Sequence, residues 1–191
     1  MLKCFTLILL IVLLINADSV SADPPSFSNF NKFAQQSEKK FPQPTGAVND
    51  FAGVIPTDIK KNMESLSSEI LMKTGTAVVV ATVTSVDGAE PDKYAHELYN
   101  TWGNGKKGEH KGVLIFLAVQ ERKIRIETGR GMSNILPDGL VGSILDQNVM
   151  PHLKKGDYGQ GLLSGMLAVG LVIAKDAGVT ISEGYTLKKP D

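Results

Sequence analysis

The chain is almost free of cysteine, since Cys4 is the only one among its 191 residues. Cys4 lies ahead of an apolar run, which is not where a lipid-attachment cysteine stands. If residues 1–22 are a signal peptide that is cleaved after Ala22, Cys4 is removed with it. The mature chain could then form no disulfide, and it would have no cysteine nucleophile and no cysteine-ligated metal site.

Net charge is absent as well, because 20 basic residues balance 20 acidic ones and the pI is about 6.8. A general nucleic-acid binder shows a basic excess or a basic face, so the composition gives no support to that class of partner. The length predicts one domain with a real hydrophobic core.

Several motifs of catalysis and nucleotide binding are missing. The sequence has no G-x-S-x-G nucleophile elbow and no P-loop. A formal G-x-G-x-x-G occurs at 103–108, but a helical segment precedes it and a strand follows, the reverse of the dinucleotide-binding order. We interpret 103–111 as a flexible basic loop. The three histidines show no metal-binding spacing, so we interpret them as surface or packing residues: His96, His110 and His152.

The N-terminus has the layout of a secretory signal peptide. Lys3 precedes the apolar run 5–15, and the small residues Val20 and Ala22 stand at the cleavage positions. The run is shorter than the roughly 20 residues of a membrane span. We therefore expect residues 1–22 to be a cleaved signal peptide, with no retained transmembrane helix and a periplasmic or secreted location. A retained anchor is the alternative.

The remaining chain divides by composition and periodicity. Residues 23–45 are rich in Pro, Ser, Asn and Gln, so we expect a flexible linker. Residues 46–178 alternate between strand-like and helical patterns in the order βαβαββαα. That order predicts an α/β fold, a three-layer α/β/α sandwich with a mixed sheet. The apolar segment 158–174 is predicted to be a core helix, and 179–191 a flexible tail.

The loop ETGRGMSNILPD, residues 127–138, is the best candidate for a ligand site. It follows the alternating strand KIRIET and precedes a helical pattern. Gly129, Arg130 and Gly131 could bring backbone N–H groups to a phosphate or another anion. Asp138 at the helix start could instead cap the helix.

Asp50 and Asp138 could together provide oxygen ligands for a divalent cation, Ca²⁺ or Mg²⁺. Each also has a structural interpretation, since Asp50 could cap the turn that follows it. Sharing one ion requires the first strand to run in the same direction as KIRIET. If it runs parallel to the central strands, Asp50 lies at the opposite edge of the sheet.

In order along the chain, several motifs resemble those of the TPM domain family, over nearly all of residues 46–178. They are VNDFAGVI (48–55), GVLIFLAV (112–119), RKIRIETGRGM (122–132), LPD (136–138) and PHLKKGDYGQGL (151–162). The resemblance implies an α/β/α fold and a location outside the cytosol. It also implies a divalent-metal site built from loop aspartates, which correspond to Asp50 and Asp138 in this chain.

The resemblance also implies an acid phosphatase activity, which is attributed to plant members. The chain departs from the family pattern in two places: Ser133-Asn134 stands where many members have Glu-Gly, and Lys111 stands where many have Asn. The first change removes a potential acidic ligand, and no catalytic residue is recognisable. We therefore expect an exported, cation-binding accessory module with an envelope or membrane protein partner. The alternative is a metal-assisted phosphatase.

Overall fold

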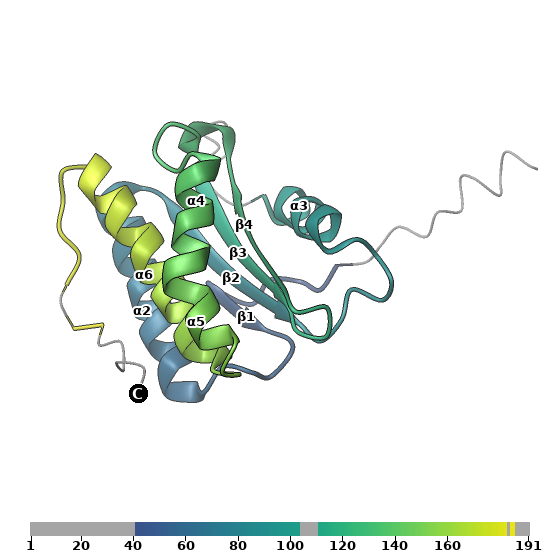
Figure 1. The fold of residues 1–191 in the computed structure, drawn as a ribbon. Helices are drawn as coiled ribbons and strands as arrows, with labels where there is room; N and C mark the ends of the chain where they lie inside the picture. The colour runs from purple at the N-terminus through teal and green to yellow at the C-terminus, as the bar shows by residue number, and fades with distance from the viewer. Residues whose placement is uncertain (1–40, 104–110, 183, 186–191) are drawn as a thin grey trace, which may run out of the picture. The chain divides into compact units, whose positions relative to one another are not determined.

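The computed structural model describes residues 41–103, 111–182 and 184–185, and they form one unit (Figure 1). Its element order confirms the expected βαβαββαα pattern. The strands are β1 (Val48–Asp50), β2 (Ala77–Val83), β3 (Gly112–Ala118) and β4 (Lys123–Thr128). The main helices are α2 (Thr57–Thr74), α3 (Pro91–Trp102), α4 (Asp138–Ile144), α5 (Met150–Leu153) and α6 (Tyr158–Asp176).

The four strands form a mixed sheet in the order β1-β2-β3-β4. β1, β2 and β3 are parallel, with Val48 opposite Val80 and Val80 opposite Ile115. β4 returns antiparallel to β3, with Ile115 opposite Ile126. We call the edge at which β1, β2 and β3 end the carboxyl edge, and the edge at which they begin, and β4 ends, the amino edge.

Helices cover both faces of the sheet and complete the three layers (Figure 1). The larger core packs α2, α4 and α6 against one face, around side chains such as Met63, Ile115 and Met166. A smaller core packs α3 against the other face, around Leu98 and Phe116. Every residue of β3 is buried, which explains its continuous apolar sequence.

The two connections between parallel strands lie on opposite faces of the sheet. α2 joins β1 to β2 on one face, and α3 joins β2 to β3 on the other. Both steps move in the same direction across the sheet, so one crossover is right-handed and the other left-handed, although right-handed connections are the general rule.

The helix expected from Asp138 onward is interrupted. α4 ends at Ile144 and continues as a π-helical turn, η3 (Leu145–Val149), before α5. Pro151 stands in α5, and because proline has no backbone N–H it cannot donate the usual helical hydrogen bond.

α6 is the core helix that the sequence predicts. It has the length and apolar composition of a membrane span, but 67% of its apolar window is buried inside the domain. Its small residues let other elements approach closely, since a Cβ at Gly170 would lie 2.7 Å from the Cδ1 atom of Ile70.

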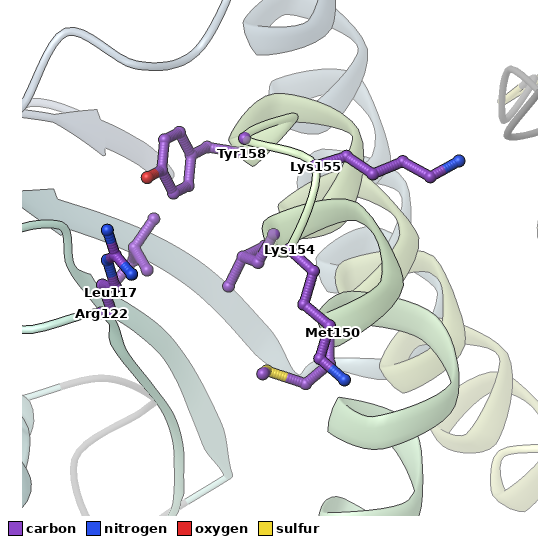
Figure 2. Close-up of a pocket in the computed structure, with 8 residues that line it drawn as sticks. Leu117, Arg122, Met150, Lys154, Lys155 and Tyr158 are labelled. Carbon is purple, nitrogen blue, oxygen red and sulfur yellow. The ribbon is translucent and has the colours of Figure 1, made fainter.

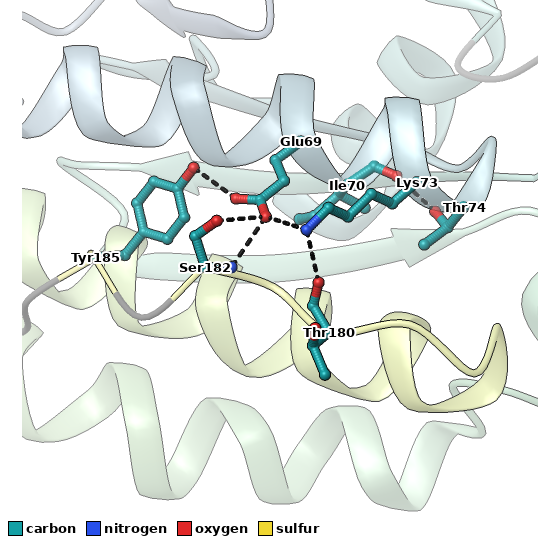
Figure 3. Close-up of polar contacts among 7 residues, drawn as sticks. All are labelled: Glu69, Ile70, Lys73, Thr74, Thr180, Ser182 and Tyr185. Carbon is teal, nitrogen blue, oxygen red and sulfur yellow. Dashed lines mark hydrogen bonds and ion pairs between the residues drawn. The ribbon is translucent and has the colours of Figure 1, made fainter.

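Residues on both sides of 46–178 make contacts with the domain. In the predicted linker, the Phe41 ring packs edge-on against Tyr94 at 5.0 Å, and the Pro42 carbonyl accepts a hydrogen bond from Trp102 Nε1. In the predicted tail, Ser182 and Tyr185 donate hydrogen bonds to the Glu69 carboxylate of α2 (Figure 3). These parts of both segments are therefore attached to the domain. The predicted signal peptide lies outside the described residues.

Candidate functional site

Asp50 is the last residue of β1, and its carboxylate accepts hydrogen bonds from other residues of the protein. Oδ1 accepts hydrogen bonds from Val54 N at 3.1 Å and from Thr82 Oγ1 at 2.5 Å. Oδ2 accepts one from Ile55 N at 2.9 Å. Asp50 therefore holds the turn between β1 and α2 against the end of β2. This is the structural interpretation that the sequence left open for it.

The direction of β1 separates the two aspartates. β1 is parallel to β2 and β3, so Asp50 lies at the carboxyl edge. Asp138 follows β4 and its loop, which places it beyond the amino edge. The two carboxylates cannot share an ion in this fold. The sequence allowed two directions for β1, and the observed direction excludes a metal centre shared by Asp50 and Asp138.

The loop at Gly129–Gly131 forms a short 3₁₀ turn, η2 (Arg130–Met132), directly after β4. Two of its N–H groups already have acceptors: Gly129 donates to Gly112 O at 3.0 Å and Met132 to Gly129 O at 2.8 Å. The N–H groups of Arg130 and Gly131 stand at the start of the turn, where a helix offers no internal acceptor. Gly129 has an ordinary extended backbone, with φ −69° and ψ 159°.

A cleft of about 250 Å³ opens beside this loop, between α3 and the end of β4. Its lining residues come from both elements: His96, Tyr99, Asn100, Glu127, Thr128, Gly129 and Arg130. The cleft therefore brings the sequence-predicted residues Gly129 and Arg130 together with side chains of α3 that the sequence did not single out.

Glu127 is the buried charge of this cleft, at 8% exposure. Its Oε1 accepts a hydrogen bond from Arg125 Nε at 2.7 Å, and its Oε2 lies 3.4 Å from His96 Nδ1. The Glu127 hydrogen bond raises the pKa of Arg125. Burial raises the pKa of Tyr99, and the Glu127 carboxylate adds to that effect. Glu127 is thus neutralised within the cleft by Arg125.

Asp138 is exposed at the first position of α4. Its charge contributes to the raised pKa of Arg125, after the larger contribution of Glu127. Among the described residues, no group of three or more His, Cys, Asp or Glu side chains could hold a metal ion. The protein side chains around Asp138 therefore do not make a complete ligand set for Ca²⁺ or Mg²⁺, which take six or more oxygens.

Sequence reasoning missed the pairing of His96 with Glu127, because it interpreted His96 as a surface or packing residue. The two residues are 31 positions apart, and no short motif links them. The only local signal was the alternation of KIRIET, which placed Arg125 and Glu127 on the same face of one strand. Of the predicted basic loop 103–111, residues 104–110 lie outside the described residues.

The fold matches solved structures. The first is the N-terminal domain of a protein from P. gingivalis, with 29% identity and a TM-score of 0.66 over 73% of this chain and 88% of that one. The N-terminal domain of a Corynebacterium glutamicum protein matches with 15% identity and a TM-score of 0.53, over 76% and 89%. A protein from the psychrophilic bacterium Bizionia argentinensis matches with 20% identity and a TM-score of 0.55, over 63% and 82%.

Among curated proteins, none matches the chain significantly. The family model described as the TPM domain matches residues 48–172, which is well over half of the chain and includes β1, both candidate aspartates and most of α6. The chain therefore belongs to the TPM domain family.

Proposed function

We propose that this chain is an exported interaction module of the cell envelope that binds a small anionic group of a protein partner in the cleft between α3 and β4. The observation that carries the proposal is the composition of that cleft. Glu127 is already paired with Arg125, so among the described residues that line the cleft the charge that remains for a ligand is that of Arg130.

The size of the cleft favours a single side chain over a larger substrate. About 250 Å³ lies below the roughly 300–1,000 Å³ typical of small-molecule sites. A carboxylate side chain of a partner would fit this volume, and Arg130 could hold it with a charge-assisted hydrogen bond. The N–H groups at the start of η2 would add two more donors.

We also propose that a divalent cation binds weakly, with the Asp138 carboxylate as its protein side-chain ligand. One carboxylate at this position would leave most of the coordination shell to loop carbonyls and water. Calcium sites of extracellular modules reach dissociation constants of about 10⁻⁴–10⁻³ M, so we expect affinity in that range or weaker. The signal-peptide pattern at residues 1–22 supports export.

The test is residue-resolved NMR of the full-length chain with N-acetylaspartate α-N-methylamide as the probe, which carries only the side-chain carboxylate, and N-acetylasparagine α-N-methylamide as its uncharged match. The charged probe should shift the amides of Asn100 and of 128–131, and its neutral match should not. Arg130→Gln should weaken binding about five- to tenfold, and Lys123→Gln, an exposed change of the same charge on β4, should not. Equal shifts with both probes would contradict the proposal.

Phosphomonoester hydrolysis is the second candidate, and the His96–Glu127 contact favours it. The contact uses His96 Nδ1, and the His96 side chain is 64% exposed, so its other ring nitrogen could transfer a proton to or from a substrate. Arg130 would face the phosphate. If this function is real, the chain hydrolyses p-nitrophenyl phosphate and His96→Ala lowers the rate at least a hundredfold. No turnover with Mg²⁺ or Ca²⁺, or an unchanged rate in His96→Ala, excludes it.

A further inference from the structure

A second cavity, larger than the cleft between α3 and β4, lies at the carboxyl edge of the sheet. Its volume is about 490 Å³, and it opens between the end of β3, the β3–β4 turn and the connection from α5 to α6. Unlike the cleft at the amino edge, it falls within the size range of small-molecule sites, roughly 300–1,000 Å³. None of its lining residues belongs to the site proposed above.

The lining of this pocket combines an apolar surface with positive charge. Three of the eight lining residues are basic and none is acidic. The apolar part comes from Leu117, Met150 and Leu153, and the charged and polar part from Arg122, Lys154, Lys155 and Tyr158. α6 also begins here, and its N-terminus adds a positive potential.

Figure 2 shows how the polar groups are arranged. The Arg122 guanidinium and the Tyr158 hydroxyl lie on the same side of the pocket, next to Leu117. The Lys154 side chain extends along the Met150 side, whereas the Lys155 ammonium points away from Arg122 and Tyr158. Arg122 and Tyr158 therefore lie on one side of the pocket, and Lys154 lies on the Met150 side.

The neighbouring acidic side chains have other partners. Asp157 caps α6 by accepting a hydrogen bond from Gln160 N at 3.3 Å. Glu121 Oε1 accepts hydrogen bonds from Ser85 Oγ and Val86 N, and Val86 belongs to the core on the opposite face of the sheet. Neither carboxylate lines the pocket, so among the described residues neither of these two groups neutralises the Arg122 charge inside it.

The backbone at Arg122 adds an independent observation. Arg122 has φ 51°, in the left-handed region that glycine or asparagine occupies at lower cost. Strained backbone of this kind concentrates at binding and catalytic sites.

We propose that this pocket binds a small amphipathic anion, a phosphate monoester or carboxylate with an apolar body. The anionic group lies against Arg122 and the Tyr158 hydroxyl, and the apolar body lies against Leu117, Leu153 and Met150. Binding here does not depend on the function proposed for the cleft between α3 and β4.

The test uses octyl phosphate, with inorganic phosphate and octanol as probes of its two halves. Titration of the full-length chain, followed by NMR, should shift the amides of 121–123 and 153–158 with octyl phosphate, more weakly with either half. Arg122→Gln should weaken octyl phosphate binding about tenfold, and Tyr158→Phe should weaken it less. Lys123→Gln is the matched control and should leave the affinity unchanged.

Two further arms separate the sources of such a ligand. Sedimentation with vesicles containing phosphatidic acid, whose headgroup is a phosphate monoester, that depends on Arg122 would identify a lipid headgroup, and octyl phosphate binding without vesicle binding would identify a free anion. The proposal is overturned if octyl phosphate does not bind at these residues, or if Arg122→Gln and Lys123→Gln lose affinity equally. Shifts at Asn100 and 128–131 instead would assign the probe to the other cleft and would also overturn it.

Discussion

Replacing Glu69 with glutamine should weaken the attachment of the segment after α6, and the loss should depend on pH. Glu69 Oε1 accepts hydrogen bonds from Lys73 Nζ at 2.7 Å and from Ser182 N and Oγ at 2.9 and 2.8 Å (Figure 3). Its Oε2 accepts one from the Tyr185 hydroxyl at 2.8 Å. Lys73 also donates to Thr180 O. The Glu69 carboxylate therefore attaches the segment after α6 to α2.

These contacts favour the ionised form of Glu69. The Lys73 hydrogen bond contributes most, burial opposes it, and the Ser182 and Tyr185 hydrogen bonds add to it, so that the pKa of Glu69 falls from 4.5 to about 2. Burial and the Glu69 contact raise the pKa of Tyr185 to about 12. Because the pKa of Glu69 is lower in the folded state, its contribution to stability is complete above pH 4.5 and is lost as the pH falls toward 2.

The magnitude follows from that shift and from the exposure of the partner. A difference of 2.5 pKa units corresponds to about 3 kcal/mol of folding free energy. The Lys73 side chain is 40% exposed, so solvent screening reduces the value. We expect Glu69→Gln to lower the free energy of unfolding by about 1–2 kcal/mol at pH 7.

Urea unfolding of both proteins at pH 7, 4.5 and 3, followed by circular dichroism, measures this difference. The difference in the free energy of unfolding between the two proteins should become smaller between pH 4.5 and 3. Glu64→Gln is the control, because Glu64 is an exposed carboxylate of the same helix. A difference that stays constant with pH, or an equal loss in Glu64→Gln, would refute the reasoning.

Other substitutions test the fold and the roles of the aspartates. Gly161→Ala should destabilise by about 1–3 kcal/mol, because a Cβ there would meet Leu153; Gly142→Ala has open space and should stabilise by about 0.5–1 kcal/mol. Both are read from thermal unfolding, and equal effects would contradict the packing around α6. Asp50→Ala should cost about 2–3 kcal/mol, since it removes the acceptor of two backbone N–H groups. Asp138→Asn should stay within about 0.5 kcal/mol, and the reverse order in urea unfolding would contradict the structural role of Asp50.

The order of elements could be predicted because it depends on local patterns. β2 and β3 are runs of apolar, partly β-branched residues, and β4 alternates, so each strand was recognisable by itself. The direction of β1 could not be predicted, because the strand has three residues and its pairing with β2 is a tertiary contact. That one direction decided whether Asp50 and Asp138 could meet.

The candidate sites were predictable only in part, and for the same reason. Gly129 and Arg130 stand in a recognisable loop, but the cleft beside them also needs His96 from α3. The pocket at Arg122 and Tyr158 joins two turns that are far apart in sequence. The contacts of the flanking segments could not be predicted, because a polar composition does not reveal that Tyr185 donates a hydrogen bond to the buried carboxylate of Glu69.

The most direct test of the central claim about the two aspartates, that a divalent cation binds at Asp138 on the amino edge and not at Asp50, is paramagnetic broadening by Mn²⁺. Mn²⁺ takes carboxylate and water oxygen ligands as Mg²⁺ does. At low Mn²⁺ concentration, amides of 129–139 should broaden while those of 51–55 stay sharp, and Asp138→Asn should remove the effect. Broadening of 51–55 at the same concentration, or broadening that survives Asp138→Asn, would contradict the claim.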